Sequence, residues 1–349
     1  MSYDDSPELS VVVPVLNEEA ELHRFLEELA RQRDTRFELI LSDGESGDGT
    51  VAAAKSLAGQ LPFPLLVVDG GKGRAAQMNV GAGLARAQLL LFLHIDSRFP
   101  DPLAFRKGID ALTPTLSGAT PLAGHFILEF DFPELPPLPY RFYGAKASLD
   151  RRGCTHGDQG MLIPASFFGE VGPFDPSLPI MEDTFLAERI REVGGWLLLP
   201  ARIRTSPRRF LAEGLLARQT LNAILMDLAH TGHLDLMASL KECYLSQDAT
   251  HRLELFPFLK VLKERIAALP RDRRGVLWRE TGRYVRSNAW QVPFWLDVLI
   301  GKGGAGKGGP FLALHDRWLG RLIDNGLADR AASLLVWIWF RCALLLGRR

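Results

Sequence analysis

A histidine and an aspartate at the end of an apolar run are the first residues that could do chemistry. Residues 89–93 are apolar without interruption, which predicts a strand buried on both faces, and His94 and Asp96 follow it. Side chains alternate along a strand, so these two would share a face if the strand continued. A carboxylate placed there can bind a hard divalent cation, which in turn can bind a diphosphate. The alternative is an ordinary polar turn after a strand.

Polar side chains follow three other predicted strands in the same way. They are Asn17 and Glu18 after residues 9–13, Asp43 after residues 37–41, and Lys72 and Arg74 after residues 64–68. Taken singly, each could cap a helix, shape a turn or simply be solvated. The carboxyl ends of parallel strands share one edge of a sheet, so together they predict one binding site for a ligand with neutral and anionic parts.

The elements that must position these side chains alternate between strand and helix. Helical spacing of apolar residues separates the strands, which is typical of a parallel sheet with crossover helices. We therefore predict an α/β fold with a mostly parallel, Rossmann-like sheet flanked by helices, followed by an all-helical C-terminal region. The predicted domains are residues 8–210 and 211–349. In the second we expect, among others, single helices over residues 211–230 and 271–290.

Bulk composition excludes several classes of protein. The chain has 349 residues and a formal net charge of zero, so no basic field favours nucleic acid. Its three cysteines fit neither a disulfide framework nor a zinc site, which indicates a reducing compartment. The acidic N-terminus does not read as a signal peptide, and no apolar run has the length of a spanning helix. We expect a cytoplasmic protein.

A second group of polar residues lies further along the chain. Glu182 and Asp183 precede a predicted helix, where the helix dipole alone would favour carboxylates. A polar turn, Gly157-Asp158-Gln159, enters a predicted strand. Arg208 and Arg209 follow another strand and would suit a diphosphate, although they could equally be a solvated surface pair.

These motifs resemble those of family 2 glycosyltransferases, which have the GT-A fold. The resemblance covers about residues 8–235 and rests on the segments at residues 11–19, 42–50 and 91–97, on residues 73–81, and on Gly-Asp-Gln-Gly followed by Glu-Asp before a helix. It implies a nucleoside diphosphate sugar, UDP- or GDP-linked, as the donor. The residues implied to bind the donor are Pro14, Asn17, Glu18, Asp43, Lys72, Arg74, Asp96, Arg208 and Arg209.

The same resemblance implies a divalent metal, Mn²⁺ or Mg²⁺. The family usually has Asp-x-Asp at this place, whereas this chain has His94 and Asp96, as a subgroup of the family does. Asp96 would hold the metal together with diphosphate oxygens. His94 would either join it or orient a neighbour, and imidazole suits manganese better than magnesium.

The family pattern also implies roles in catalysis. Asp183 would be the general base that takes the proton of the acceptor hydroxyl, and Glu182 would hold the acceptor or the loop. Gly157, Asp158 and Gln159 would lie on the acceptor side. Attack opposite the leaving diphosphate would invert the anomeric carbon.

Two other functions and several partners stay open. A sugar-phosphate nucleotidylyltransferase shares this kind of sheet but has a glycine-rich loop after its first strand, where this chain has residues 14–18. A non-catalytic nucleotide-sugar-binding or scaffold protein is the other alternative. The last helix carries Trp337 and Trp339 near arginines, which suits a peripheral contact with the cytoplasmic membrane face, a buried helix or a homodimer. A lipid-linked acceptor would fit the membrane alternative.

Overall fold

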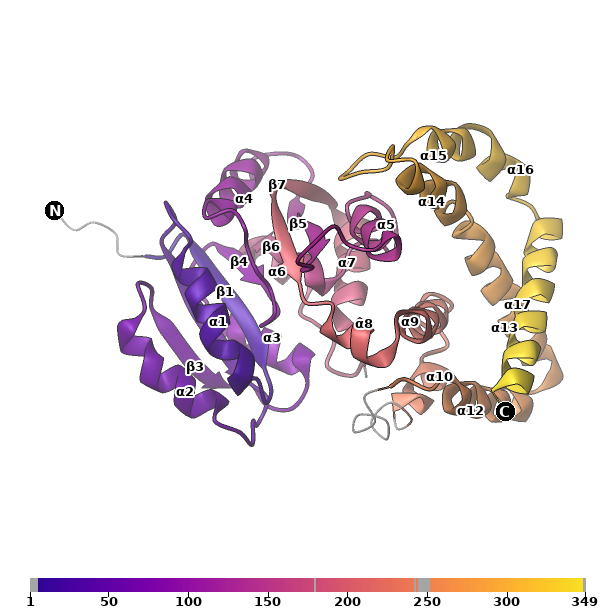
Figure 1. Cartoon of the computed structure of the whole chain (residues 1–349), viewed down its shortest axis with the longest axis horizontal. Helices are drawn as coiled ribbons and strands as arrows, with labels where there is room; N and C mark the ends of the chain where they lie inside the picture. The colour runs from indigo at the N-terminus through magenta and orange to yellow at the C-terminus, as the bar shows by residue number, and fades with distance from the viewer. Residues whose placement is uncertain (1–5, 179, 242, 244–251, 348–349) are drawn as a thin grey trace. The chain divides into compact units, whose positions relative to one another are not determined.

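The computed structural model describes residues 6–178, 180–241, 243 and 252–347 (Figure 1). The chain divides into two compact units. The first comprises residues 1–206 with 305–307, and the second comprises residues 207–304 with 308–349. This division falls close to the predicted boundary at residue 210. The assignment of separate roles to the two parts stays a prediction.

A single seven-stranded sheet forms the centre of the first unit. Its strands are β1 (Leu9–Val15), β2 (Phe37–Asp43), β3 (Leu65–Asp69), β4 (Leu89–Phe92), β5 (Leu122–Phe130), β6 (Met161–Pro164) and β7 (Gly195–Thr205). Their order is β3-β2-β1-β4-β6-β5-β7, and only the pairs that involve β6 are antiparallel. The predicted mostly parallel α/β sheet is confirmed.

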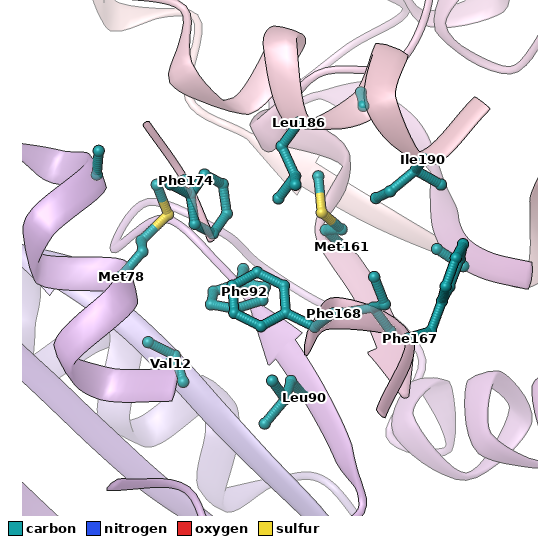
Figure 2. Packing of buried hydrophobic residues seen from close by; sticks show 14 of the residues in the cluster. Val12, Met78, Leu90, Phe92, Met161, Phe167, Phe168, Phe174, Leu186 and Ile190 are labelled. Carbon is teal, nitrogen blue, oxygen red and sulfur yellow. The ribbon is translucent and has the colours of Figure 1, made fainter. Parts of the chain in front are cut away.

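Helices flank this sheet and bury their apolar faces on it. They are α1 (Glu19–Ala30), α2 (Thr50–Leu57), α3 (Arg74–Leu84), α4 (Ala104–Leu112), α5 (Leu138–Ala147), α6 (Ala165–Val171) and α7 (Glu182–Val193). Figure 2 shows Phe92 of β4 beside Phe168 and Phe174, with Met78 of α3 and Leu186 of α7 around them. This core fixes the starts of α3 and α7 relative to the end of β4, because both helices pack into it.

The strand order creates a crevice at one edge of the sheet. After β1 the chain adds β2 and β3 on one side, and β4 then pairs on the other side of β1. Such a reversal leaves a gap at the carboxyl ends of the two central strands, where α/β proteins bind ligands. Because β6 runs antiparallel to β4, with Met161 opposite Phe92, the turn that precedes β6 lies at the carboxyl end of β4.

The second unit is helical in its described part, as predicted. Its helices are α8 (Arg208–Glu213), α9 (Leu215–His230), α10 (Leu234–Ser239), α12 (Leu255–Ala268), α13 (Arg271–Ser287), α14 (Gln291–Leu299), α15 (Pro310–Leu314), a π-helical segment at His315–Leu319, α16 (Gly320–Ile323) and α17 (Gly326–Leu346). Among the described residues, no helix combines the length and apolar character needed to cross a membrane.

One helix prediction for this unit was wrong, and another placed the end of the helix three residues too late. The single helix predicted over residues 211–230 breaks at Gly214, whose φ of 88° lies in the left-handed region that glycine adopts most easily. The helix predicted over residues 271–290 ends at Ser287, and a separate helix, α14, follows it. Proline disfavours a helix, but Pro293 lies in the first turn of α14, where a missing N–H costs no hydrogen bond.

Candidate active site

His94, at the carboxyl end of β4, pairs with Asp158 from the turn before β6. Nδ1 of His94 donates to Oδ1 of Asp158 at 2.9 Å. Burial on its own would lower the pKa of His94, but the hydrogen bond to Asp158 raises it above its ordinary value. Burial would likewise raise the pKa of Asp158, and the partnership with His94 and the charge of Arg74 bring it well below its usual range. The hydrogen bond between them therefore favours the ionised form of Asp158 and the protonated form of His94.

Arg74, the first residue of α3, joins this pair to the start of α7. Its Nε forms an ion pair with Oε1 of Glu182, and one terminal nitrogen lies 3.5 Å from Nε2 of His94. Burial would lower the pKa of Arg74, but the charges of Glu182 and Asp183 raise it. Arg74 is 40% exposed on its side chain, while Glu182 is 6% exposed, so the arginine is the more accessible partner.

Asp183 is held by two backbone N–H groups. Its Oδ2 accepts from the N–H of Gly157 at 2.6 Å, and its Oδ1 accepts from the N–H of Thr184 at 2.8 Å. Burial would raise the pKa of Asp183, but chiefly the positive charge of Arg74, together with the hydrogen bond from the Gly157 N–H, lowers it. The carboxylate is thus ionised and fixed in orientation at neutral pH. Met181, just before α7, has a left-handed φ of 67°, a strained conformation typical of functional sites.

Asp96 lies in a different set of contacts. Its Oδ2 accepts from the Thr205 hydroxyl at 3.2 Å and from the Ser206 N–H at 3.3 Å. Within the described residues, no three His, Cys, Asp or Glu side chains come together as a metal site. That Asp96 would hold a metal together with diphosphate oxygens stays a prediction. Whether His94 joins as a ligand stays a prediction.

The loops after β1 and β2 meet at the same edge of the sheet. Asn17 has a left-handed φ of 55°, its N–H donates to the Ser46 hydroxyl at 2.9 Å, and its Oδ1 accepts from Gly47 at 2.8 Å. Oδ2 of Asp43 accepts from the N–H groups of residues 45 and 46, whereas its buried Oδ1 has no hydrogen-bond partner. That oxygen is the kind of group a nucleoside donor could satisfy.

The other predicted donor residues near these loops have defined positions. Pro14 lies in β1 opposite Ser42 of β2. The N–H of Glu18 donates to the Thr50 hydroxyl at 2.8 Å. Nζ of the exposed Lys72 lies 3.0 Å from Oε2 of Glu45, which connects the loops after β3 and β2.

Three further predicted residues have contacts that do not single out a ligand. Gln159 is fully buried, and its amide nitrogen donates to the carbonyls of Ala147 and Cys154, which shapes the turn before β6. Arg208 and Arg209 open α8 in the second unit, and Nε of Arg209 lies 3.9 Å from Oε1 of Glu213. The binding roles predicted for all three stay predictions.

Some residues that shape the site were missed. Gln77 of α3 is buried and donates to the carbonyls of Val15 and Ser42, so it ties α3 to the ends of β1 and β2. Nδ1 of His156 lies 3.1 Å from the Thr184 hydroxyl, and burial lowers the pKa of His156 despite the nearby Asp183. Gln77 lies inside the segment at residues 73–81, and His156 directly precedes the Gly157-Asp158-Gln159 turn. Their positions in or beside these motifs are the signal that could have found them.

Taken together, the geometry offers an anion-binding arginine and an ionised, oriented carboxylate in one place. Arg74 can bind a phosphate oxygen through charge-assisted hydrogen bonds. Asp183, fixed through Gly157, can accept a proton from a hydroxyl. This combination suits a group transfer in which an anion leaves and a hydroxyl attacks.

Comparison with known proteins points to the same chemistry. Residues 10–145 match the model of the family described as glycosyl transferase family 2. A "PGL/p-HBAD biosynthesis glycosyltransferase" of Mycobacterium bovis is 29% identical over 185 residues, which cover 51% of this chain and 67% of that protein. An "uncharacterized glycosyltransferase" of Mycobacterium tuberculosis is 29% identical over 235 residues, covering 66% of this chain and 84% of the relative.

Solved structures resemble the chain more distantly. A mannosyltransferase from Pyrobaculum calidifontis, in complex with GDP-Man and Mn²⁺, is 16% identical with a TM-score of 0.49, over 99% of this chain and 87% of that one. The predicted family resemblance is confirmed by the family match at residues 10–145 and by the glycosyltransferase relatives.

Proposed function

We propose that this glycosyltransferase moves a sugar from a nucleoside diphosphate sugar to an acceptor hydroxyl with inversion at the anomeric carbon. The observation that carries the proposal is the convergence of Arg74, Asp183 and the His94–Asp158 pair at the carboxyl end of β4. The donor is a UDP- or GDP-linked sugar, as the family resemblance implies.

On the donor side, we assign the nucleoside to the loops after β1 and β2. Asn17, Glu18 and Asp43 would contact the base and ribose, and the buried Oδ1 of Asp43 without a partner supports this assignment. Arg74 would bind the diphosphate, because it is the more exposed member of its ion pair with Glu182. Lys72 would add positive charge at the rim.

On the acceptor side, Asp183 is the proposed general base. The acceptor oxygen forms a bond to the anomeric carbon while the bond from that carbon to the diphosphate oxygen breaks, and the electron pair leaves with the diphosphate. The hydroxyl proton passes to Asp183, whose lowered pKa makes it a weak base. A weak base is sufficient because the hydroxyl becomes acidic only as the new bond forms.

A divalent ion, Mn²⁺ or Mg²⁺, fits Asp96 better than His94. The Asp96 carboxylate is a hard oxygen ligand of the type that both ions prefer. Both nitrogens of His94 face other groups, Nδ1 towards Asp158 and Nε2 towards the Arg74 guanidinium at 3.5 Å. His94 therefore suits the role of orienting Asp158. When bound, the ion would neutralise charge on the leaving diphosphate.

For the rest of the protein we keep the expectations from the sequence as proposals. The acceptor side would include the turn with Gly157 and Asp158, next to Asp183 and Glu182. The protein would act in the cytoplasm or on the cytoplasmic membrane face. A lipid surface and a second copy of the chain are the two candidate partners of the helical region.

Calorimetric titration with UDP, GDP and CDP, each with and without Mn²⁺, tests this function. We expect one nucleotide to bind with micromolar, metal-dependent affinity, and Asp96→Ala to abolish that dependence. Asp110→Ala, a change at an exposed carboxylate of α4 that pairs with Arg106, is the matched control and should bind as wild type. Absence of binding by all three nucleotides to the folded protein would contradict the proposal.

A further inference from the structure

Helix α17 has one packed face and one unusually apolar exposed face. It runs beside α13 in Figure 1, and the Phe340 ring meets Trp278 at 5.6 Å between centroids. Of its side chains only Phe340 and Leu344 are buried. Eight of its other large apolar side chains are exposed: Leu327, Leu334, Leu335, Trp337, Ile338, Trp339, Leu345 and Leu346.

This exposed face, which we call the α17 face, is defined by those eight residues. Leu335 is 67% exposed and Leu346 is 70% exposed, so these side chains project into solvent. Soluble monomers rarely show continuous apolar patches of this kind unless a partner covers them. The α17 face therefore requires a partner.

The charges on α17 identify which partner fits. From residue 330 to residue 347 the sequence contains two charged residues, Arg330 and Arg341, and no carboxylate. Asp329, which directly precedes this segment, forms ion pairs with Arg286 at 2.5 Å and with Arg283 at 3.6 Å. The guanidinium carbon of Arg341 lies over the Trp337 ring, 5.6 Å from its centroid. An apolar face edged by arginine and tryptophan suits the boundary between lipid headgroups and acyl chains.

A groove beside the α17 face supplies more positive charge. Side chains of α12 and α17 line a hollow of about 500 Å³, with Lys260, Lys263 and Arg341 as its cations and Glu264 as its one carboxylate. Phe256, Leu344 and Leu345 add apolar lining. A lining of both cations and apolar side chains suits an anionic headgroup that continues into a hydrocarbon chain.

We propose that α17 lies flat on an anionic lipid surface, with the α17 face at the acyl boundary and the groove holding a phosphate headgroup. A second copy of the chain fits less well, because a symmetric contact would bring Arg330 and Arg341 of both copies together without carboxylates on the face to balance them. This inference goes beyond sugar transfer and does not depend on it.

Cosedimentation of the full chain with vesicles tests the proposal. We use phosphatidylcholine vesicles with and without phosphatidylglycerol, at low and high salt. We expect at least about tenfold stronger binding to the anionic vesicles, weakened by salt, together with a blue shift of tryptophan fluorescence on binding. Donor nucleotide binding, measured separately, should be unaffected by these vesicles.

Matched variants locate the contact. Leu335→Glu with Ile338→Glu should reduce vesicle binding at least about tenfold, and Lys260→Glu with Lys263→Glu should remove the preference for anionic vesicles. Leu216→Glu, at an 81% exposed leucine of α9, should bind as wild type. Failure of the folded wild type to bind either vesicle would overturn the proposal. The proposal would also be overturned if sedimentation equilibrium showed a dimer that Leu335→Glu with Ile338→Glu disrupts, while the same variant bound vesicles as wild type does.

Discussion

Gly157→Ala tests the geometry of the site with the smallest possible change. A Cβ at this position would lie 2.7 Å from Oδ2 of Asp183 and 2.8 Å from Nε2 of His94. The backbone of Gly157 is not left-handed, so alanine is excluded only by these two side chains. The new methyl group would therefore push directly against the proposed base and the His94–Asp158 pair.

The size of the effect follows from these distances. Ordinary contact begins at 3.4 Å, so the methyl group must displace Asp183 and His94 by roughly 0.6–0.7 Å each. Displacements approaching 1 Å at reacting groups cost on the order of 10²-fold in rate. We expect kcat to fall on the order of 10²-fold. Nucleotide affinity should change less than kcat, because the loops assigned to the nucleoside contain neither Asp183 nor His94, although His94 lies 3.5 Å from Arg74.

The assay is release of nucleoside diphosphate from the donor that calorimetry identifies, with circular dichroism and thermal unfolding as checks of folding. Gly169→Ala in α6 is the matched control, since a Cβ there meets nothing within 4 Å. If folded Gly157→Ala turned over within a few-fold of Gly169→Ala, the placement of Asp183 and His94 at the reacting centre would be wrong.

Three further predictions concern charge. Asp183→Asn should lower kcat about 10²–10⁴-fold while nucleotide affinity is kept, as measured by steady-state kinetics. If Glu182→Gln gave this loss instead, Glu182 would be the general base. The pKa of buried His125 is lowered to about 4, chiefly by burial, so the folded form binds fewer protons than the unfolded form. Stability should fall by roughly 3 kcal/mol as the pH drops from 6.5 to 4, and His125→Asn should flatten that dependence in urea unfolding. Burial raises the pKa of Asp227 to about 6, despite a hydrogen bond from Thr281, so its ionisation costs stability as the pH rises from 3.8 to 6. Asp227→Asn should be more stable than wild type above pH 6 and similar to it below pH 4, and equal stability at both pH values would contradict this assignment.

Much of the fold and part of the site could be predicted because their causes are local. Buried parallel strands are continuous apolar runs, so β1, β2 and β4 and the polar residues after them stand out in the sequence. The helix that Glu182 and Asp183 begin was predicted from its apolar spacing, whereas their proposed roles came from the family resemblance and stay predictions. The break at Gly214 was missed because a glycine inside an apolar helical pattern is compatible with either a helix or a turn.

The pairings inside the site could not be predicted, because they join distant segments. Arg74 and Glu182 are separated by 108 positions, and His94 and Asp158 by 64. His94 lies beside Asp158 because β6 runs antiparallel to β4. The direction of β6 cannot be predicted from the local sequence pattern. Asp96 accepts a hydrogen bond from Thr205 because β7 ends at the same edge of the sheet. These contacts depend on strand order, which single-sequence patterns leave undetermined.

The charge of the site explains why a divalent ion belongs in the proposed mechanism. Asp158, Glu182 and Asp183 gather around Arg74 and His94, so carboxylates outnumber cations even when His94 is protonated. Such a cluster repels a diphosphate, and the Arg74 guanidinium is already paired with Glu182. Arg74 can bind a phosphate only by sharing or exchanging that partner. A divalent cation bound with the donor would supply the missing positive charge, and Asp96 would offer it an oxygen ligand outside the Arg74 cluster.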